Sequence, residues 1–356
     1  MKKNIFKEKK ILITGHTGFK GSWLTLWLLL KGAKIIGLSK NINTRPSHFQ
    51  LLNIKKKIKH YQVDLKNLSK IKKIINNSRP DYIFHLAAQA LVKNSYDNPI
   101  ETWSSNSIGT IHLLEALRKV KKKTFVILIT SDKSYKNLEL DRGYKEDDLI
   151  GGKDPYSASK ASAELAIQSY INSFFSHKNN KVFISVARAG NVIGGGDWSE
   201  NRLVPDCFKK WSKNRFVDIR NPNSTRPWQH VLEALNGYLI LAKKMTIRPR
   251  NFHGEVFNFG PKNFDNNSVL KVLKKIKSFY PAAKWNIRKN KKFHESNLLK
   301  LNSKKAKKKL NWECKLSFSD NIRYVTEWYK SFYDRKQKIN ICKLSSEQIR
   351  QYEKIK

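Results

Sequence analysis

The chain has 356 residues, of which 40% are hydrophobic, and its formal net charge is +43 at pH 7. This length and composition suit a globular protein with a large core and one or two lobes. So high a charge would also suit a nucleic-acid partner, but the basic clusters at 55–57, 121–123 and 304–309 lack interleaved aromatics. We therefore expect a solvated basic surface without a nucleic-acid site, and a weak attraction for anionic substrates.

The three cysteines, Cys207, Cys314 and Cys342, are far apart and show neither metal-ligand spacing nor a disulfide framework. This pattern suits a reducing compartment. Residues 1–10 have no signal-peptide core, and the most apolar stretch, 23–30, is too short to span a bilayer. We expect a cytoplasmic protein with no bound metal and no membrane contact.

The first 38 residues predict the opening of a dinucleotide-binding fold. An apolar strand at 11–13 runs into a glycine turn, followed by a helix at 22–31 and a strand at 33–38. The glycines let the backbone approach a pyrophosphate, and the helix N-terminus supplies amide donors. The spacing is Gly-x-x-Gly-x-x-Gly, which differs from the usual fingerprint. The predicted cofactor contacts in the turn are Gly15, His16, Thr17, Gly18, Phe19, Lys20 and Gly21.

The next two strands supply the rest of the predicted cofactor site. No acid follows the second strand, where one would hold the ribose of NAD, so this position leaves NADP open. A third strand at 58–63 precedes an acid that can accept a hydrogen bond from adenine, and a fourth at 81–86 precedes small residues over which a cofactor can lie. We interpret His85 as a packed core histidine. The further predicted contacts are Asp64, Leu65, Leu86, Ala87 and Ala88.

A helix at 102–119 and a fifth strand at 125–129 lead to Ser131, Asp132 and Lys133. The carboxyl end of a parallel strand is where open sheets place ligands. A polar loop at 136–154 and a helix at 156–175 come next.

Tyr156 and Lys160 are four residues apart, so a helix places them on one face. A lysine ammonium favours the phenolate and lowers the pKa of tyrosine from its usual value of about 10. Such a pair can take a proton from an alcohol near neutral pH. The spacing alone also fits an ordinary surface pair.

The pattern changes after a sixth strand at 182–187. A glycine-rich loop at 188–198 is followed by a short helix, a strand at 217–219, an apolar helix at 231–243 and a strand at 255–259. We predict an α/β fold with a Rossmann-type doubly wound parallel sheet and a smaller, mixed α/β C-terminal lobe for substrate. The predicted domains are 1–188 for the cofactor, with segments near 217–260 partly returning to it, 189–330 for a nucleotide-sugar, and a helical extension at 331–356.

The glycine turn together with Tyr156 and Lys160 resembles the extended short-chain dehydrogenase/reductase superfamily, whose members act on nucleotide-sugars. Longer motifs resemble the CDP-glucose 4,6-dehydratase family over about residues 9–330. These motifs lie at 14–23, 130–135, 151–161, 188–198 and 226–233.

The resemblance implies NAD as cofactor and CDP-glucose as substrate. It implies that Tyr156 takes the proton of the sugar 4-hydroxyl during oxidation at C4, that Lys160 holds the cofactor ribose, and that Ser131 binds the 4-hydroxyl. Asp132 would protonate the departing 6-hydroxyl. Lys133 lies where dTDP-glucose relatives carry a glutamate that serves as the C5 base. Hydride return to C6 would give CDP-4-keto-6-deoxyglucose.

The resemblance also implies substrate contacts and an assembly. Ser134 departs from the family motif, which has cysteine there. A homo-oligomer, dimer or tetramer, is expected. A dTDP-glucose 4,6-dehydratase or a UDP-sugar 4-epimerase is the nearest alternative, although a simple epimerase has no use for Asp132 and Lys133. An inactive basic nucleic-acid-binding protein is an alternative from another class. The predicted substrate contacts are Gln89, Asn191, Arg202, Arg226 and His230.

Overall fold

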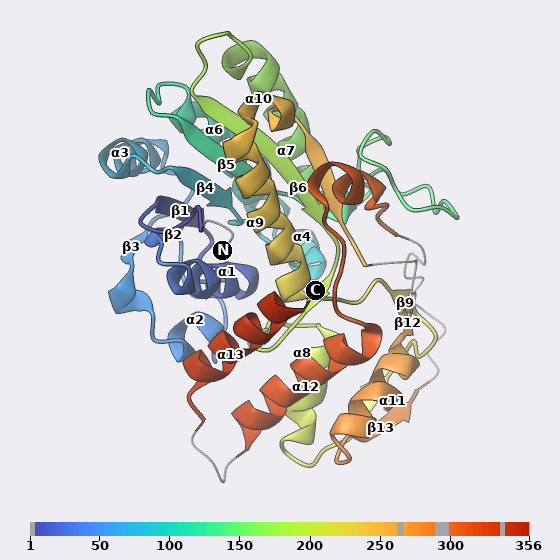
Figure 1. Ribbon diagram of the computed structural model, residues 1–356. Helices are drawn as coiled ribbons and strands as arrows, with labels where there is room; N and C mark the ends of the chain where they lie inside the picture. Colours follow the sequence, from blue (N-terminus) through green and yellow to red (C-terminus); the bar gives the residue numbers. More distant parts are fainter. Residues whose placement is uncertain (1–3, 262–266, 289–298, 335–338, 356) are drawn as a thin grey trace.

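Seven strands form the central sheet of the protein, and the computed structural model describes residues 4–261, 267–288, 299–334 and 339–355. The strand order is β11-β6-β5-β4-β1-β2-β3, with every neighbouring pair parallel (Figure 1). The order reverses between β1 and β4, and ligands of such sheets bind at the carboxyl ends beside this point. The strands are β1 Lys10–Thr14, β2 Lys34–Ser39, β3 Lys59–Gln62, β4 Tyr82–His85, β5 Thr124–Ile129, β6 Val182–Ala189 and β11 Val256–Phe259.

Helices cover both faces of this sheet. In β1, Ile11 and Ile13 pack into one hydrophobic core while Leu12 packs into the other. Burial on both faces explains why the inner strands are largely apolar, whereas the edge strand β3 is polar and mostly exposed. The first core contains residues of α1 and α9, and the second contains residues of α3, α6 and α7. Their bounds are α1 Phe19–Leu30, α3 Leu68–Ser78, α6 Gly109–Leu117, α7 Pro155–Tyr170 and α9 Val231–Ile247.

Helix boundaries differ from the sequence prediction in several places, of which two matter for the site. The first helix begins at Phe19, inside the glycine turn, rather than at residue 22. The helix predicted at 102–119 instead begins at Pro99, whose fixed φ suits a first helical position. Its first part, α5 Pro99–Trp103, passes through the π-helical turn Ser104–Ile108 into α6. The short helices that were not predicted include α2 His48–Leu51, α4 Val92–Asp97, α10 Pro249–Phe252 and the 3₁₀ turns Lys55–Lys57 and Asp132–Ser134.

A second lobe is built from later segments, seen around α8, α11 and α12 in Figure 1. Its strand pairs are short: β8 with β13, and β9 with β12. A further pair, β7 with β10, lies where the chain leaves and rejoins the large sheet. Of segment 217–260, β11 joins the large sheet whereas β8 does not, and the domain bounds remain a prediction. The elements are β7 Val192–Ile193, α8 Leu203–Trp211, β8 Val217–Ile219, β9 Thr225–Arg226, β10 Gln229–His230, β12 Asn267–Ser268, α11 Val269–Phe279, β13 Trp285–Ile287, the π-helical turn Ala306–Leu310 and α12 Phe318–Tyr333.

The C-terminal segment forms α13 (Ile341–Lys354), which packs on α1 and α12. The Tyr352 hydroxyl donates to Glu233 Oε2 of α9 at 2.6 Å, and Trp27 Nε1 of α1 donates to Glu353 Oε1 at 2.8 Å. The helix α13 is therefore bound to α1 and α9, which pack in the first core.

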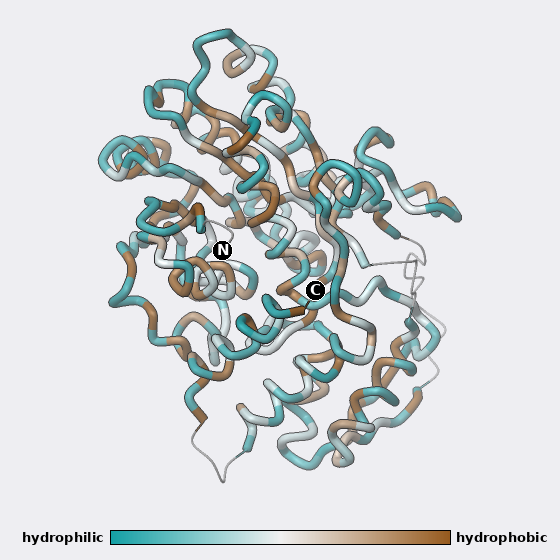
Figure 2. The backbone as a smooth tube through the Cα atoms, viewed as in Figure 1, coloured by the Kyte–Doolittle hydropathy of each residue, from teal (hydrophilic) through white to brown (hydrophobic). Residues whose placement is uncertain are grey.

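Hydropathy follows this layering, with hydrophilic residues on the outer loops (Figure 2). Within the described ranges, no helix is both long and apolar enough to cross a membrane.

Candidate active site

A single buried turn at residues 131–134, here called the β5 turn, follows the carboxyl end of β5. The Ser131 hydroxyl donates to Asp132 Oδ1 at 2.9 Å and accepts from the Lys133 amide at 3.2 Å. Ser131 and Asp132 are buried and Lys133 is half-buried. The three predicted residues therefore lie side by side at the end of the sheet where ligands bind.

Helix α7 brings Tyr156 and Lys160 to this turn. Asp154 caps the helix by accepting from the Ser157 amide at 3.0 Å, and Pro155 takes the first helical position. Tyr156 and Lys160 then lie one turn apart, both buried. Because the Ser131 hydroxyl is close enough to hydrogen-bond the phenol of Tyr156, the turn and the helix share one site.

Burial dominates the electrostatics of this site. It raises the pKa of Asp132, against the lowering effect of the Lys133 charge. It lowers the pKa of Lys160 to about 8, and the Glu164 charge acts in the opposite direction. The expectation that Lys160 lowers the pKa of Tyr156 is not met: burial raises that pKa, and the main opposing influence is the hydrogen bond with Ser131. A raised pKa suits Asp132 as a proton donor.

The glycine turn fits a dinucleotide pyrophosphate. Gly15 has φ +74°, and a Cβ there would lie 2.7 Å from the Ala87 amide nitrogen. A Cβ on Gly21 would lie 2.1 Å from the Gly15 carbonyl oxygen, so both positions require glycine. Gly18 is exposed and caps α1 without a side-chain hydrogen bond. The first-turn amides are therefore open to an anion such as a phosphate.

The side chains of His16 and Thr17 bind neighbouring strands. His16 Nδ1 lies 2.9 Å from Ser39 Oγ, and His16 Nε2 lies 2.7 Å from His60 Nδ1. Burial lowers the pKa of His16 to about 4, so the ring is neutral at pH 7. Thr17 Oγ1 donates to the Asn41 carbonyl at 2.7 Å. Any cofactor contact from these two residues would therefore come mainly from their backbone.

Lys40, which follows β2, is held by two carboxylates. Its Nζ lies 3.1 Å from Asp64 Oδ2 and 3.0 Å from Glu101 Oε1. Asp64 lies at the end of β3, as predicted, and its carboxylate is paired with Lys40. The remaining predicted cofactor contacts surround the same strand ends: Leu65 is buried, while Phe19, Lys20, Leu86, Ala87 and Ala88 are half-buried.

The interpretation of His85 as a core histidine is confirmed. It is 3% exposed, and its two ring nitrogens lie 2.7 Å from Thr14 Oγ1 and 3.2 Å from Thr110 Oγ1.

The predicted substrate contacts do not all reach the site. The Gln89 amide is engaged locally, donating to the Leu91 carbonyl at 3.0 Å and to Thr102 Oγ1 at 2.9 Å. Asn191 is exposed directly after β6. Arg202 Nε lies 3.5 Å from Asp197 Oδ2, and the Arg202 charge acts on Tyr156.

Arg226 lies on β9 and its Nη1 donates to the carbonyl of Thr225 at 2.8 Å. Arg226 is half-buried, and its contact with substrate remains a prediction. A Cβ on Gly190 would lie 3.3 Å from Asp132 Oδ2 and 3.9 Å from Pro227, so the chain beside Arg226 borders the β5 turn.

The structure contradicts a substrate contact by His230. The residue has no exposed surface, and its Nδ1 accepts from the Leu232 amide at the start of α9. Its ring packs against Trp23 and Tyr324, and burial lowers its pKa to about 3. His230 is a neutral helix cap in the core.

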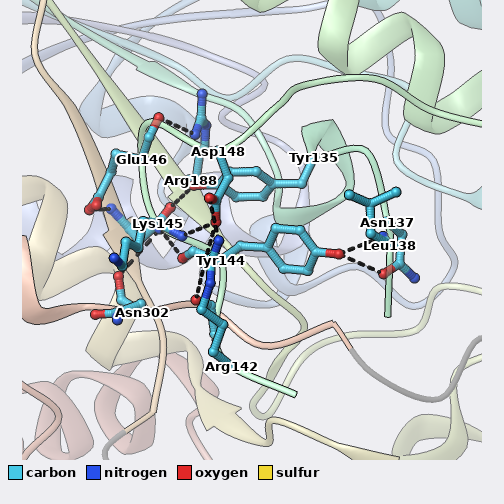
Figure 3. Close-up of polar contacts among 12 residues, drawn as sticks. Tyr135, Asn137, Leu138, Arg142, Tyr144, Lys145, Glu146, Asp148, Arg188 and Asn302 are labelled. Carbon is cyan, nitrogen blue, oxygen red and sulfur yellow. Dashed lines mark hydrogen bonds and ion pairs between the residues drawn. The ribbon is translucent and has the colours of Figure 1, made fainter. Parts of the chain in front are cut away.

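Sequence reasoning missed Glu164 and Arg188, which form a buried ion pair behind the β5 turn. Arg188 also anchors the polar loop at 136–154, since its Nη1 donates to the Glu146 carbonyl at 3.1 Å (Figure 3). Glu164 comes four residues after Lys160, and this spacing could have predicted that it lies on the same face of the helix.

Among the residues with described positions, no group of three or more His, Cys, Asp or Glu side chains is arranged to hold a metal ion.

A doubly wound sheet with a glycine turn, and a buried serine, tyrosine and lysine beside it, defines a site of the short-chain dehydrogenase/reductase class. The sequence profile of the family described as GDP-mannose 4,6 dehydratase matches residues 12–325. The chain is 40% identical over 344 residues to the CDP-glucose 4,6-dehydratase of Salmonella typhimurium strain LT2, covering 96% of this chain and 95% of the relative. The chain therefore belongs to the nucleotide-sugar 4,6-dehydratase family of the extended short-chain dehydrogenase/reductases, a family of enzymes.

Other relatives agree with this fold. The dTDP-D-glucose 4,6-dehydratase of Dictyostelium discoideum is 30% identical over 285 residues, 75% of this chain and 61% of the relative. The crystal structure of dTDP-glucose 4,6-dehydratase from Bacillus anthracis in complex with NAD has a TM-score of 0.76 at 21% identity, covering 92% of this chain and 98% of that one. The UDP-glucose 4-epimerase of Thermotoga maritima, solved with UDP-glucose, also has a TM-score of 0.76, at 24% identity, covering 91% of this chain and 100% of that one.

Proposed function

We propose that the protein removes water from CDP-glucose to give CDP-4-keto-6-deoxyglucose, with NAD as a cofactor that begins and ends oxidised. The observation that carries this proposal is the β5 turn. It adds a buried acid, Asp132, and an amine, Lys133, to the Ser131, Tyr156 and Lys160 set that alcohol oxidation alone requires. The relative in Salmonella typhimurium, described as CDP-glucose 4,6-dehydratase, supports the choice of substrate.

The cofactor site supports NAD. Bound NAD would supply a hydride acceptor at sugar C4 and a hydride donor at C6. The glycine turn would hold the pyrophosphate, Asp64 the adenine and Lys160 the nicotinamide ribose. The 2′-phosphate of NADP needs a free cation, and Lys40 is already paired with Asp64 and Glu101. Arg45 is exposed a little further on, so the support for NAD comes from the related dTDP-glucose 4,6-dehydratase solved in complex with it.

The chain's own residues move the protons. Tyr156 takes the proton of the 4-hydroxyl, which Ser131 orients, and the hydrogen bond with Ser131 favours the phenolate form that accepts this proton. The 4-keto group then acidifies C5–H, and Lys133 takes this proton. Asp132 gives its proton to the 6-hydroxyl, which leaves as water. Lys133 then gives its proton back to C5, and hydride return to C6 would complete the product. The proton gained by Tyr156 replaces the one given up by Asp132, so one water is lost and there is no net redox change.

Substrate binding is the less constrained part of the proposal. Arg202 and Arg226 would hold the diphosphate, because a guanidinium can bind two phosphate oxygens at once. Asn191 is placed to join them after β6. A homo-oligomer and a cytoplasmic location remain predictions, and size-exclusion chromatography with light scattering tests the first.

The test is incubation of the purified protein with NAD and, separately, with CDP-, dTDP-, UDP- and GDP-linked sugars, followed by mass spectrometry. We expect loss of one water from CDP-glucose. Good turnover of dTDP- or UDP-glucose without product from CDP-glucose would overturn the substrate assignment, and an epimer of unchanged mass would overturn the reaction.

A further inference from the structure

A buried ion pair lies directly behind the β5 turn. It joins Glu164 of α7 to Arg188 of β6, and each side chain is only 1% exposed. Arg188 Nε donates to Glu164 Oε1 and Oε2, both at 2.9 Å, and Arg188 Nη2 also donates to Oε2. The fork of the guanidinium thus fixes the plane of the carboxylate.

The same carboxylate holds both ends of the catalytic turn. Glu164 Oε1 accepts from Thr130 Oγ1 at 2.7 Å and from Ser134 Oγ at 2.8 Å. These two hydroxyl residues flank Ser131, Asp132 and Lys133. Ser134 Oγ also lies 2.7 Å from the Ser131 carbonyl. Any displacement of the carboxylate would therefore move the turn.

Glu164 shares its helix with the other half of the site. It comes one turn after Lys160 and two turns after Tyr156, with all three buried. The carboxylate therefore links the residues on α7 to those on the β5 turn by direct contacts. Its charge also favours the ammonium form of Lys160, against burial, which holds the pKa of that residue at about 8.

Arg188 continues the network away from the site. Its guanidinium lies 4.5 Å from the ring centre of Tyr135, and the Tyr135 hydroxyl donates to Asn258 Oδ1 of β11 at 2.9 Å. The contact of Arg188 with the Glu146 carbonyl extends the network to the loop at 136–154 (Figure 3). The ion pair is therefore also in contact with Tyr135 and with the loop at 136–154.

We propose that Glu164 is a positioning residue, whose carboxylate fixes the β5 turn against Tyr156 and Lys160 and supplies negative charge to the Lys160 ammonium. This role rests on the proposed dehydratase function. A purely structural ion pair would affect stability alone, whereas a positioning residue also affects kcat and the pH dependence of the reaction.

Two substitutions separate geometry from charge. E164D keeps the charge and retracts the carboxylate by one methylene, and a misplacement of about 1 Å can lower a rate about 100-fold. E164Q keeps the length and removes the charge. We expect both to lower kcat for CDP-glucose by about 10- to 100-fold with a much smaller change in KM. In E164Q the alkaline limb of kcat should also move to lower pH, because Lys160 loses its proton more readily.

Two further variants keep the test decisive. E164Q leaves Arg188 buried without its counter-charge, which can unfold the chain. S134A removes one donor to the carboxylate and keeps the ion pair. It should lower kcat by about 10-fold with an unchanged alkaline limb, since a hydrogen bond to a charged group contributes about 1.5 kcal/mol or more. E115Q is the matched control, because Glu115 pairs with Arg118 at 3.0 Å on the partly exposed face of α6. We expect E115Q to behave as wild type.

Wild-type kcat in S134A and E164D would overturn the proposal. The proposal would also be overturned if E164Q folds, melts at a lower temperature, and keeps the wild-type kcat and the wild-type alkaline limb of the kcat profile. Failure of the wild-type protein to convert CDP-glucose is a separate result, which counts against the proposed function.

Discussion

Asp132→Asn separates oxidation from loss of water. In the wild-type protein the Ser131 hydroxyl donates to Asp132 Oδ1 at 2.9 Å. Asparagine has the same shape, and its amide oxygen can accept this hydrogen bond. It cannot give a proton to the 6-hydroxyl. Burial raises the pKa of Asp132, so the folded protein binds this proton more tightly than the unfolded chain does, and ionising the carboxyl near neutral pH costs stability. The substitution removes that cost, so the variant should be at least as stable as wild type.

General acid catalysis contributes about 10²- to 10⁴-fold, which is about 3 to 5 kcal/mol at 1.36 kcal/mol per tenfold. Asp132 is 5% exposed, so solvent is poorly placed to replace it, and we expect the upper part of this range. In a single-turnover experiment with CDP-glucose, absorbance of the reduced nicotinamide should accumulate in the variant while product formation slows. Asp147→Asn, in the exposed part of the neighbouring loop, is the control. Product formation at the wild-type rate, without accumulation, would refute the acid role.

Three further substitutions test other parts of the account. Tyr156→Phe should abolish reduction of the nicotinamide while circular dichroism stays unchanged, and a full first oxidation would exclude Tyr156 as the base. Lys160→Met should lose activity but gain up to about 3 kcal/mol in free energy of unfolding at pH 7, because the folded pKa of about 8 lies below the unfolded value of 10.5. This gain is present below pH 8 and fades as the pH rises toward 10.5; a loss of stability at pH 7 would contradict it. Tyr352→Phe leaves Glu233 Oε2 without the Tyr352 donor and should lower the free energy of unfolding by about 1 to 3 kcal/mol in urea with kcat retained; unchanged stability would show that α13 is anchored elsewhere.

The sequence was most informative where one local pattern determines the structure. The inner strands of the large sheet are buried on both faces and are largely apolar runs, so they could be located. The spacing of Tyr156 and Lys160 fixed their shared face. The pairing of β8 with β13 could not be predicted, because it joins segments more than sixty residues apart without a distinctive pattern in either.

Side-chain surroundings were harder to predict than elements. His230 follows a polar segment in sequence, but it is enclosed by Trp23 and Tyr324, which come from distant parts of the chain. Likewise, the rise in the pKa of Tyr156 depends on its burial, which the spacing to Lys160 does not reveal. The partner of Glu164 became known only once β6 was placed beside β5.

The most direct test of the central claim follows the hydrogen at C4. CDP-glucose carrying deuterium at C4 is converted in ordinary water with unlabelled NAD, and the product is examined by nuclear magnetic resonance. We predict that the deuterium appears at C6 of the keto-deoxy sugar, because the same hydride leaves C4 and returns to C6. Two results would contradict the proposed reaction: a sugar that keeps its deuterium at C4, or a keto-deoxy sugar whose C6 carries no deuterium.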